Sequence, residues 1–384
     1  MKNLVKMICG RGARSCSKKK LNILVVGCKG QLGSWLLKSF SEDAMKASSP
    51  FNVVVGCDLP EVDISKRYCL DEYLNQSVVA PPIKFHWVIN CAAVTNTTAI
   101  EVDRNTRDLS YAVNVLGPKH IASSCAYHKS KMIHISTDYV FSEKSVPMDE
   151  VGSPIKTGIE EFPRSMYGLH KLLGEREVQL AFKDHPEDFM ILRTSWLYGN
   201  SESSFPVKFL KNCLAAKKSG KTEVEVVDDC FGRPTSVQYL TKFIRAAIVT
   251  GLGGVVDAQA PSDPISRLDF ATKVLDSWNF YAGHFEPTIP ENLDLTGVAI
   301  KACKTSDLPE AAQAVDHPKD MPIFSRTSEI STTTPLFAMT RERLKEMLNQ
   351  VYSCSVTWEE IYSKWLSDEG GYKLLENALL NCAS

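Results

Sequence analysis

Tyr167 and Lys171 lie four residues apart in the segment PRSMYGLHKLLGE, a spacing that places both side chains on one face of a helix. A free tyrosine has a pKa of about 10 and is a poor acid at neutral pH, but a neighbouring ammonium group favours the phenolate. Such a pair can serve as a proton donor for the reduction of a carbonyl group. Alone, a tyrosine and a lysine at this spacing usually form an exposed pair without function, so the assignment depends on what precedes them.

A strand end that carries hydroxyl groups precedes this helix by about thirty residues. The segment HISTDYVF, residues 134 to 141, begins with an apolar run and continues into Ser136, Thr137 and Asp138. If the run is a strand, these side chains lie at its carboxyl end, where open α/β sheets bind their ligands. The Tyr–Lys helix and the strand end together therefore predict one chemical site.

Three glycines near the start of the chain, Gly27, Gly30 and Gly33, join an apolar run to an amphipathic helical pattern. Glycine permits an unusual backbone angle, leaves room for a pyrophosphate and allows close packing of helix on strand. The first residues of the helix, Gln31 and Leu32, then offer free N–H groups to an anion. Three glycines can also form a simple tight turn, but the flanking strand and helix favour a dinucleotide site.

The second apolar run, FNVVVGCD, ends in Asp58, which can accept hydrogen bonds from the adenosine ribose and would repel a 2′-phosphate. Lys29, inside the glycine turn, has the opposite preference, because a cation there could bind a 2′-phosphate. The cofactor is therefore expected to be NADH or NADPH, without a choice between them. A third run, VINCAAVT, continues into the small residues Cys91, Ala92 and Ala93, where a flat cofactor needs backbone clearance. Asn114, on a later helix, is expected to bond backbone across elements.

Strand patterns alternate with helical patterns, which predicts an α/β fold, a doubly wound parallel sheet with crossover helices. Beyond residue 195 this alternation weakens, and the region from 280 to 336 is poorly periodic. The predicted strands are 22–27, 51–57, 85–91, 131–136, 188–194 and 254–259, and the predicted helices are 31–41, 67–76, 107–129, 166–183 and 237–250.

Composition limits the classes of protein to which the chain can belong. Its 384 residues, 44% hydrophobic and 23% charged, are enough for two domains, and a net charge of −1 gives no field that would attract nucleic acid or an anionic membrane. No apolar run approaches the roughly twenty residues of a membrane-spanning helix. The twelve cysteines are scattered singly, which favours free thiols in a reducing, cytoplasmic location and gives no metal site. The basic residues 1–20 indicate a disordered tail, with an organellar address as the alternative.

The order of these motifs, with ILRTSWLYG at 191 to 199 and VVDDCFGRPTS at 226 to 236, resembles the extended short-chain dehydrogenase/reductases, specifically the dTDP-4-dehydrorhamnose reductase family. The resemblance implies a Rossmann-type domain at 21–195, to which 237–260 returns, and a smaller substrate-binding domain made of 196–236 and 261–384. It also implies NAD(P)H-dependent hydride transfer to the keto carbon of a nucleotide-linked 4-keto-6-deoxy sugar.

The same resemblance implies roles for individual residues. Thr137, Tyr167 and Lys171 match the catalytic positions of the family, and the latter two also contact the cofactor. Asp63 and Ile64, in CDLPEVDIS, match its adenine-side contacts. Trp196 matches a residue that lines the sugar pocket, and Asp138 is assigned to the same substrate contact. The expected partners are a nucleotide sugar and a second copy in a homodimer.

A second class remains open, because the regulatory β subunit of methionine adenosyltransferase resembles the same family and is a dinucleotide-binding partner rather than an enzyme. The altered loop at 94 to 101, in which Thr98 replaces an expected aspartate, and the unusual C-terminal third favour this alternative. The combination of Thr137, Tyr167 and Lys171 with Trp196 favours the reductase.

Overall fold

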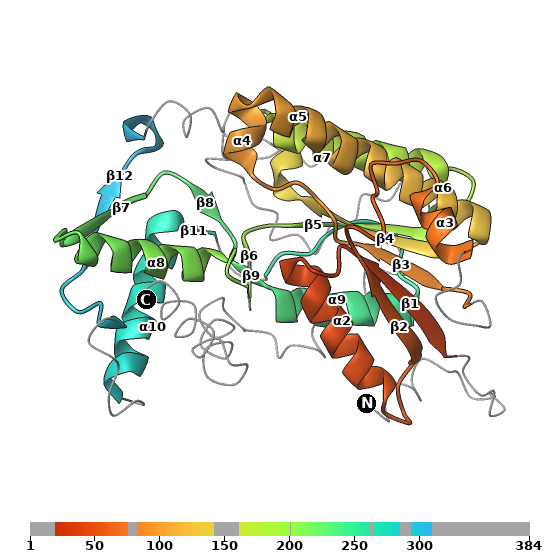
Figure 1. The fold of residues 1–384 in the computed structure, drawn as a ribbon, viewed down its shortest axis with the longest axis horizontal. Helices are drawn as coiled ribbons and strands as arrows, with labels where there is room; N and C mark the ends of the chain where they lie inside the picture. Colours follow the sequence, from red (N-terminus) through yellow and green to blue (C-terminus); the bar gives the residue numbers. More distant parts are fainter. Residues whose placement is uncertain are drawn as a thin grey trace, which may run out of the picture.

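A computed structural model describes residues 20–75, 83–141, 161–199, 201–260, 264–284 and 293–308. Its centre is a six-stranded parallel sheet in the order β10-β5-β4-β3-β1-β2 (Figure 1). The order reverses between β1 and β3, and ligands of open α/β sheets bind outside the carboxyl ends of strands at such a point. All six strands lie where the sequence predicts them: β1 Leu21–Val26, β2 Phe51–Cys57, β3 Trp87–Asn90, β4 Lys131–Thr137, β5 Phe189–Thr194 and β10 Gly254–Asp257.

Helices cover both faces of this sheet, as its apolar strands require. On one face, α2 (Gln31–Ala44) and α9 (Val237–Thr250) pack against alternate side chains of the strands. On the other face lie α3 (Cys69–Asn75), α6 (Gly117–His128) and α7 (Met166–Ala181) (Figure 1). The predicted doubly wound fold is confirmed.

The prediction of a single helix at 107–129 is wrong in one respect, because a π-helical turn interrupts this helix. The chain forms α5 (Arg104–Tyr111), a π-helix (Ala112–Leu116) and then α6. Pro118 has no N–H group to donate to the carbonyl oxygen of Asn114, four residues earlier, so the regular α-helical ladder cannot continue there. A Cβ atom added at Gly174 would lie 2.2 Å from that same oxygen, so α7 packs directly on the π turn.

A second hydrophobic core forms outside the sheet from elements that the sequence did not predict. It includes Tyr198, Phe270 and Trp278, all fully or almost fully buried. The sequence from 280 to 336 is poorly periodic, yet residues 299–303 in it form a strand. Residues beyond 308 lie outside the part of the chain that the structure describes. Within the described ranges, the further elements are α4 Thr97–Val102, α8 Phe205–Lys218, α10 Arg267–His284, β6 Leu197–Tyr198, β7 Glu223–Val227, β8 Phe231–Gly232, β9 Thr235–Ser236, β11 Ile265–Ser266, β12 Ala299–Cys303 and the single-turn 3₁₀ helices Asp138–Val140, Pro186–Asp188 and Thr305–Asp307.

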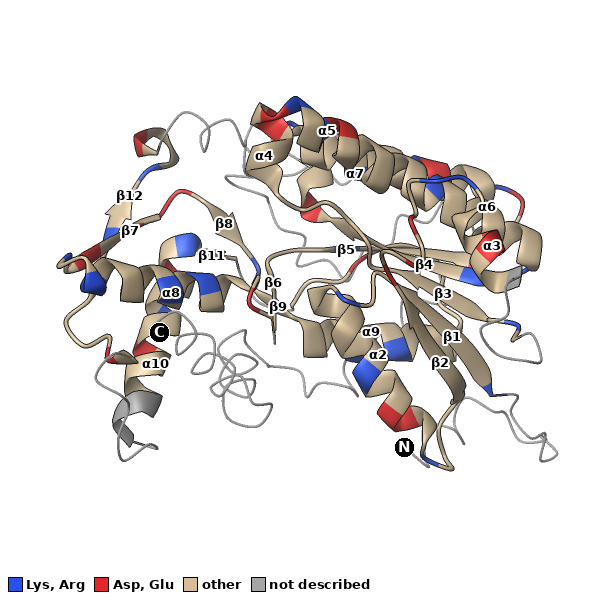
Figure 2. Ribbon diagram, in the orientation of Figure 1, with Lys and Arg blue, Asp and Glu red and all other residues tan. Residues whose placement is uncertain are grey.

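In the view of Figure 2, α2 and α5 each carry charged residues of both signs. None of the helices within the described ranges is long and apolar enough to cross a membrane. The carboxyl edge of the sheet, where β1, β3 and β4 end, is the edge at which open α/β sheets bind their ligands.

Candidate active site

The glycine turn lies between β1 and α2, at the point where the strand order reverses. Gly27 has φ +78°, and an added Cβ would lie 2.5 Å from the backbone nitrogen of Ala92. A Cβ on Gly33 would lie 2.1 Å from the carbonyl oxygen of Gly27. These two glycines are required by the packing of the chain itself.

Gly30 differs from the other two glycines of the turn. Its φ of −73° suits any residue, and an added Cβ would meet nothing closer than the Gly27 oxygen at 3.3 Å. It is the N-cap of α2 and has no side chain to cap the helix. The fold therefore gives little reason for glycine here, whereas a pyrophosphate on the N-terminus of α2 would need the open backbone. The turn fits a dinucleotide, with Gln31 and Leu32 in the first turn of α2.

Asp58 and Lys29 lie together on one side of this turn. The Asp58 carboxylate accepts hydrogen bonds from the backbone N–H groups of Lys29 and Leu59, both at 2.8 Å. The Lys29 ammonium donates to the carbonyl oxygen of Leu59 and lies 3.5 Å from the Glu61 carboxylate. The acidic and basic groups that give opposite cofactor preferences are thus neighbours, and the choice between NADH and NADPH stays open.

The remaining predicted cofactor residues lie in two segments that hydrogen bonds hold in place. Asp63 accepts hydrogen bonds from the backbone N–H and the hydroxyl of Ser65, which lower the pKa of its carboxyl, and Ile64 is buried. The segment Cys91, Ala92, Ala93 follows β3, and the N–H of Cys91 donates to Val26 at 2.9 Å.

Asn114 holds the end of this second segment. Its side-chain oxygen accepts from the N–H of Val94, and its amide donates to the carbonyl oxygen of Val94, both at 2.9 Å. It also donates to the Ser110 hydroxyl at 3.0 Å. The expectation that Asn114 bonds backbone across elements is confirmed, and this pairing fixes the loop beside Gly27.

The start of α7 is fixed by two side chains. Ser165 is the N-cap, and its hydroxyl accepts from the N–H of Gly168 at 3.0 Å. The Glu101 carboxylate, from α4, accepts from the N–H of Met166 at 2.5 Å. A Cβ on Gly168 would lie 2.1 Å from the carbonyl oxygen of Tyr139, so the first turn of α7 rests directly on the segment after β4. This contact sets the position of the next residues along the helix.

Thr137, Asp138 and Tyr167 meet at the carboxyl end of β4. The Thr137 hydroxyl donates to the Asp138 carboxylate at 3.1 Å, and the Tyr167 ring lies edge-on to Tyr139 with centroids 5.5 Å apart. Burial raises the pKa of Tyr167, Asp138 raises it further, and a hydrogen bond with Thr137 acts in the opposite direction. The lowering expected from Lys171 is not found, and burial is the largest effect on this pKa. Tyr167 therefore keeps its proton in the free protein, although burial makes it a weaker acid than a free tyrosine.

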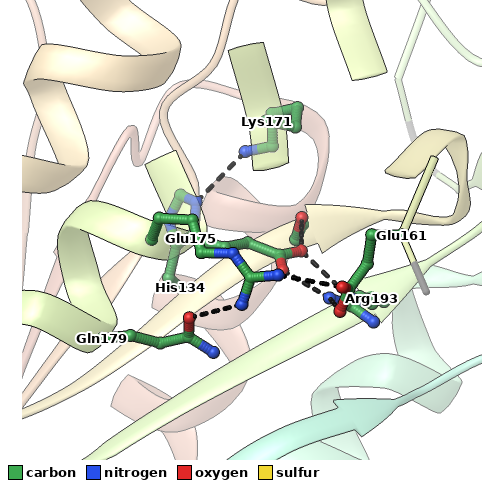
Figure 3. Close-up of polar contacts among 8 residues, drawn as sticks. His134, Glu161, Lys171, Glu175, Gln179 and Arg193 are labelled. Atoms are coloured by element: carbon green, nitrogen blue, oxygen red, sulfur yellow. Dashed lines mark hydrogen bonds and ion pairs between the residues drawn. The ribbon is translucent and has the colours of Figure 1, made fainter. Parts of the chain in front are cut away.

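Lys171 lies one helical turn after Tyr167 and is only 2% exposed. Its Nζ donates to the carbonyl oxygen of Ile135 at 2.7 Å and lies 3.4 Å from Nε2 of His134 (Figure 3). Burial lowers the pKa of Lys171 to about 8. The structural alternative of an exposed Tyr–Lys pair is therefore wrong, since Lys171 points into the sheet.

A buried network of charges, which the sequence analysis missed, is centred on Glu175, one helical turn after Lys171. Glu175 accepts hydrogen bonds from the Ser136 hydroxyl at 2.5 Å and from Nε and Nη2 of Arg193 at 3.1 and 2.6 Å (Figure 3). Arg193 also donates to Glu161 at 2.7 Å. The signal was present, because Arg193 falls inside a predicted buried strand, where a charge needs a partner.

This network predicts a large effect for Glu175→Gln. Arg193 would lose the charge of its closest carboxylate while it stays buried, and breaking a buried ion pair typically costs about 3–5 kcal/mol. Since Glu161 remains, we expect a loss in unfolding free energy of about 3 kcal/mol in urea titrations. Glu177→Gln is the matched control, because Glu177 lies on the same helix as Glu175 but is more exposed. This substitution removes the ion pair between Glu177 and Lys119 and should cost less than about 1 kcal/mol. Equal costs for the two variants would contradict the prediction.

Trp196 and Asp138, the predicted substrate contacts, are linked through a residue that the sequence analysis missed. Trp196 has φ +42°, and its ring packs so closely on Gly232 that a Cβ there would lie 2.3 Å from it. The guanidinium of Arg267, on α10, lies 3.5 Å from the centre of the ring. Asp138 is buried, which raises its pKa, and Arg267 opposes that effect. Arg267 lies where no element was predicted, so no local pattern identified it.

A glycine turn at the switch point of a parallel sheet, beside a helix that carries Tyr167 and the buried Lys171, agrees with the class that the motifs resemble, the extended short-chain dehydrogenase/reductases. The chain belongs to the family described as RmlD substrate binding domain, whose model matches residues 21–353. The dTDP-4-dehydrorhamnose reductase of Mycobacterium tuberculosis is 29% identical over 254 residues, 66% of this chain and 74% of the relative.

Solved structures show the same fold. A dTDP-4-dehydrorhamnose reductase from Clostridium acetobutylicum aligns with a TM-score of 0.61 and 24% identity, over 90% of this chain and 98% of its own. The enzyme of that name from Bacillus anthracis, solved in complex with NADP, aligns with a TM-score of 0.58 and 23% identity, over 87% of this chain and all of its own. At these identities the likeness is one of fold.

Proposed function

We propose that this protein is an NAD(P)H-dependent reductase of a nucleotide-linked 4-keto-6-deoxy sugar, of the dTDP-4-dehydrorhamnose type. The observation that supports this most is the meeting of Thr137 and Tyr167 at the carboxyl end of β4, with Lys171 buried on the same helix face. Membership of the RmlD family and the reductase names of its relatives agree with it. The regulatory-subunit alternative is not favoured by these relatives.

Each residue has a distinct role in the proposed reaction. Bound NAD(P)H supplies the hydride that adds to the keto carbon. Tyr167 donates its hydroxyl proton to the carbonyl oxygen, so that hydride and proton together give an alcohol. The Thr137 hydroxyl, which donates to Asp138 in the free protein, would turn to donate a hydrogen bond to the same oxygen. Lys171 binds the nicotinamide ribose and, as an ammonium, stabilises the phenolate that Tyr167 becomes once it has donated its proton.

The substrate is assigned to the side of the sheet edge where Trp196 and Asp138 lie. We propose that 196–236 and 261–384 form the substrate domain and cover this edge, while 21–195 and 237–260 bind the cofactor. Arg267, stacked on Trp196, is placed to meet an anionic part of a sugar nucleotide. A cytoplasmic location is part of the proposal, as the scattered cysteines indicated.

A spectrophotometric screen tests the function. Oxidation of NADH and of NADPH is followed with dTDP-linked and UDP-linked 4-keto-6-deoxy sugars as substrates. We expect turnover with at least one dTDP-linked substrate and one of the two cofactors. If no substrate is reduced although the dinucleotide binds, and the protein co-purifies with a methionine adenosyltransferase, the regulatory-subunit reading replaces the reductase.

A homodimer is also proposed, through the outer face of α7. Leu169, Leu173 and Leu180 are 37%, 38% and 64% exposed there, and Tyr111 on the adjoining α5 is 45% exposed. An apolar helix face of this kind suits an isologous contact with a second copy. We expect light scattering to give a dimer for the parent and a monomer for Leu173→Glu. Val249→Glu, on α9 at the opposite face of the sheet, should leave the dimer intact; a parent that is monomeric contradicts the proposal.

A further inference from the structure

Three buried side chains form a hydrogen-bonded row from β3 to Lys171. The backbone N–H of Ala92 donates to Oδ1 of Asn90 at 3.1 Å, which fixes the orientation of the Asn90 amide. Its Nδ2 group therefore faces Nδ1 of His134, 3.1 Å away. An amide N–H₂ group can only donate, so Nδ1 of His134 must accept. Asn90 and His134 are both fully buried.

The orientation of Asn90 fixes the tautomer of His134. A neutral imidazole that accepts at Nδ1 carries its proton on Nε2. Burial lowers the pKa of His134 well below its usual value, and Lys171 lowers it further, so the ring is neutral. Its Nε2–H group thus faces Nζ of Lys171 at 3.4 Å (Figure 3). The lone pair of a neutral amine can accept a hydrogen bond from this N–H group. An ammonium group has no lone pair and cannot accept one.

Burial acts more strongly on the pKa of Lys171 than the groups around it, of which Glu175 acts in the opposite direction and raises it. The Ile135 carbonyl oxygen accepts one N–H, which either form of the lysine can donate. Glu175, on the same helix, has its two oxygens engaged by Ser136 and Arg193. Cys91, after β3, is a thiol rather than a thiolate, because burial raises its pKa to about 12. A buried ammonium is costly, so burial shifts the ionisation equilibrium of Lys171 toward the amine.

We propose that His134 is a positioning residue which, in the tautomer imposed by Asn90, donates a hydrogen bond from Nε2–H to the amine form of Lys171 and so favours deprotonation of this lysine. Near neutral pH, Lys171 then exchanges between this amine and the ammonium that the catalytic site requires. The catalytic consequence rests on the function proposed above, whereas the protonation state can be measured without cofactor or substrate. The two can therefore fail separately.

Nuclear magnetic resonance of the cofactor-free full-length protein tests this inference. Imidazole ¹⁵N shifts report the tautomer of His134, assigned with His134→Gln, and the [¹³Cε]lysine signal assigned with Lys171→Met reports the ionisation of Lys171. We expect a protonated Nε2 and an unprotonated Nδ1 from about pH 6 to about pH 9. Lys171 should titrate near 8, well below the other lysines. A protonated Nδ1, or a Lys171 that titrates with the exposed lysines, overturns the proposal.

Asn90→Asp provides a directed perturbation. The new carboxylate can still accept from Ala92 but must also accept from Nδ1–H of His134, which reverses the tautomer and presents a lone pair to Lys171. We expect the titration midpoint of Lys171 to rise by more than about one pH unit. The same substitution in a His134→Gln background controls for the added charge and should give less than about half of that shift. Equal shifts in both backgrounds would mean that charge alone acts, and would overturn the role of His134.

Discussion

Tyr167→Phe should reduce kcat by about 10² to 10⁴, because general acid catalysis typically contributes a factor of that size. The ring and its edge-on contact with Tyr139 remain, so the fold and the affinity for NAD(P)H should change little. Thr137 loses its hydrogen-bond partner at the phenol but keeps the one to Asp138. Steady-state kinetics on the substrate found in the screen, together with calorimetric titration of NAD(P)H, measure both quantities.

Tyr139→Phe is the matched control for this prediction. It removes the hydroxyl of Tyr139, whose ring contacts that of Tyr167. Tyr139 has no assigned part in proton transfer. We expect its kcat to fall by less than about tenfold, since no general acid is lost. If Tyr167→Phe turns over as fast as the parent, or if Tyr139→Phe is the inactive variant of the two, Tyr167 is not the acid.

Gly30→Val should weaken NAD(P)H binding by at least about 100-fold, since a side chain over the N-terminus of α2 would block two charge-assisted hydrogen bonds of about 1.5 kcal/mol or more each. The fold should survive, because the ordinary φ of Gly30 and the 3.3 Å contact of an added Cβ demand only a small adjustment. Isothermal titration calorimetry measures the affinity, and circular dichroism on heating measures the fold.

Gly33→Val gives the contrasting result that makes this test specific. Its Cβ would overlap the carbonyl oxygen of Gly27 at 2.1 Å, so we expect a fall in melting temperature as well as a loss of binding. Binding by Gly30→Val as tight as that of the parent would show that the turn does not hold a pyrophosphate. A similar loss of stability in both variants would show that Gly30, too, is required by the fold.

The sequence by itself determined which segments form the six strands of the sheet and that helices cross over between them. Each central strand is a short apolar run and each helix repeats its apolar residues at helical spacing, as Leu32, Leu36 and Phe40 do in α2, so local pattern was enough. Glycine spacing likewise predicted the turn after β1, and the spacing of Tyr167 and Lys171 predicted their common helix face. These features depend on neighbours within a few positions along the chain, and a sequence displays such neighbours directly.

Only the tertiary structure decided the surroundings that give these residues their properties. The partner of Arg193 is 18 positions away, and His134 acquires its tautomer from Asn90, 44 positions earlier. Arg267 reaches Trp196 from a helix that no pattern predicted. Burial, rather than the nearby lysine, controls the pKa of Tyr167. Desolvation and hydrogen-bond direction arise only when distant segments pack, and for this reason the residue types of the site could be predicted from sequence but their charge states could not.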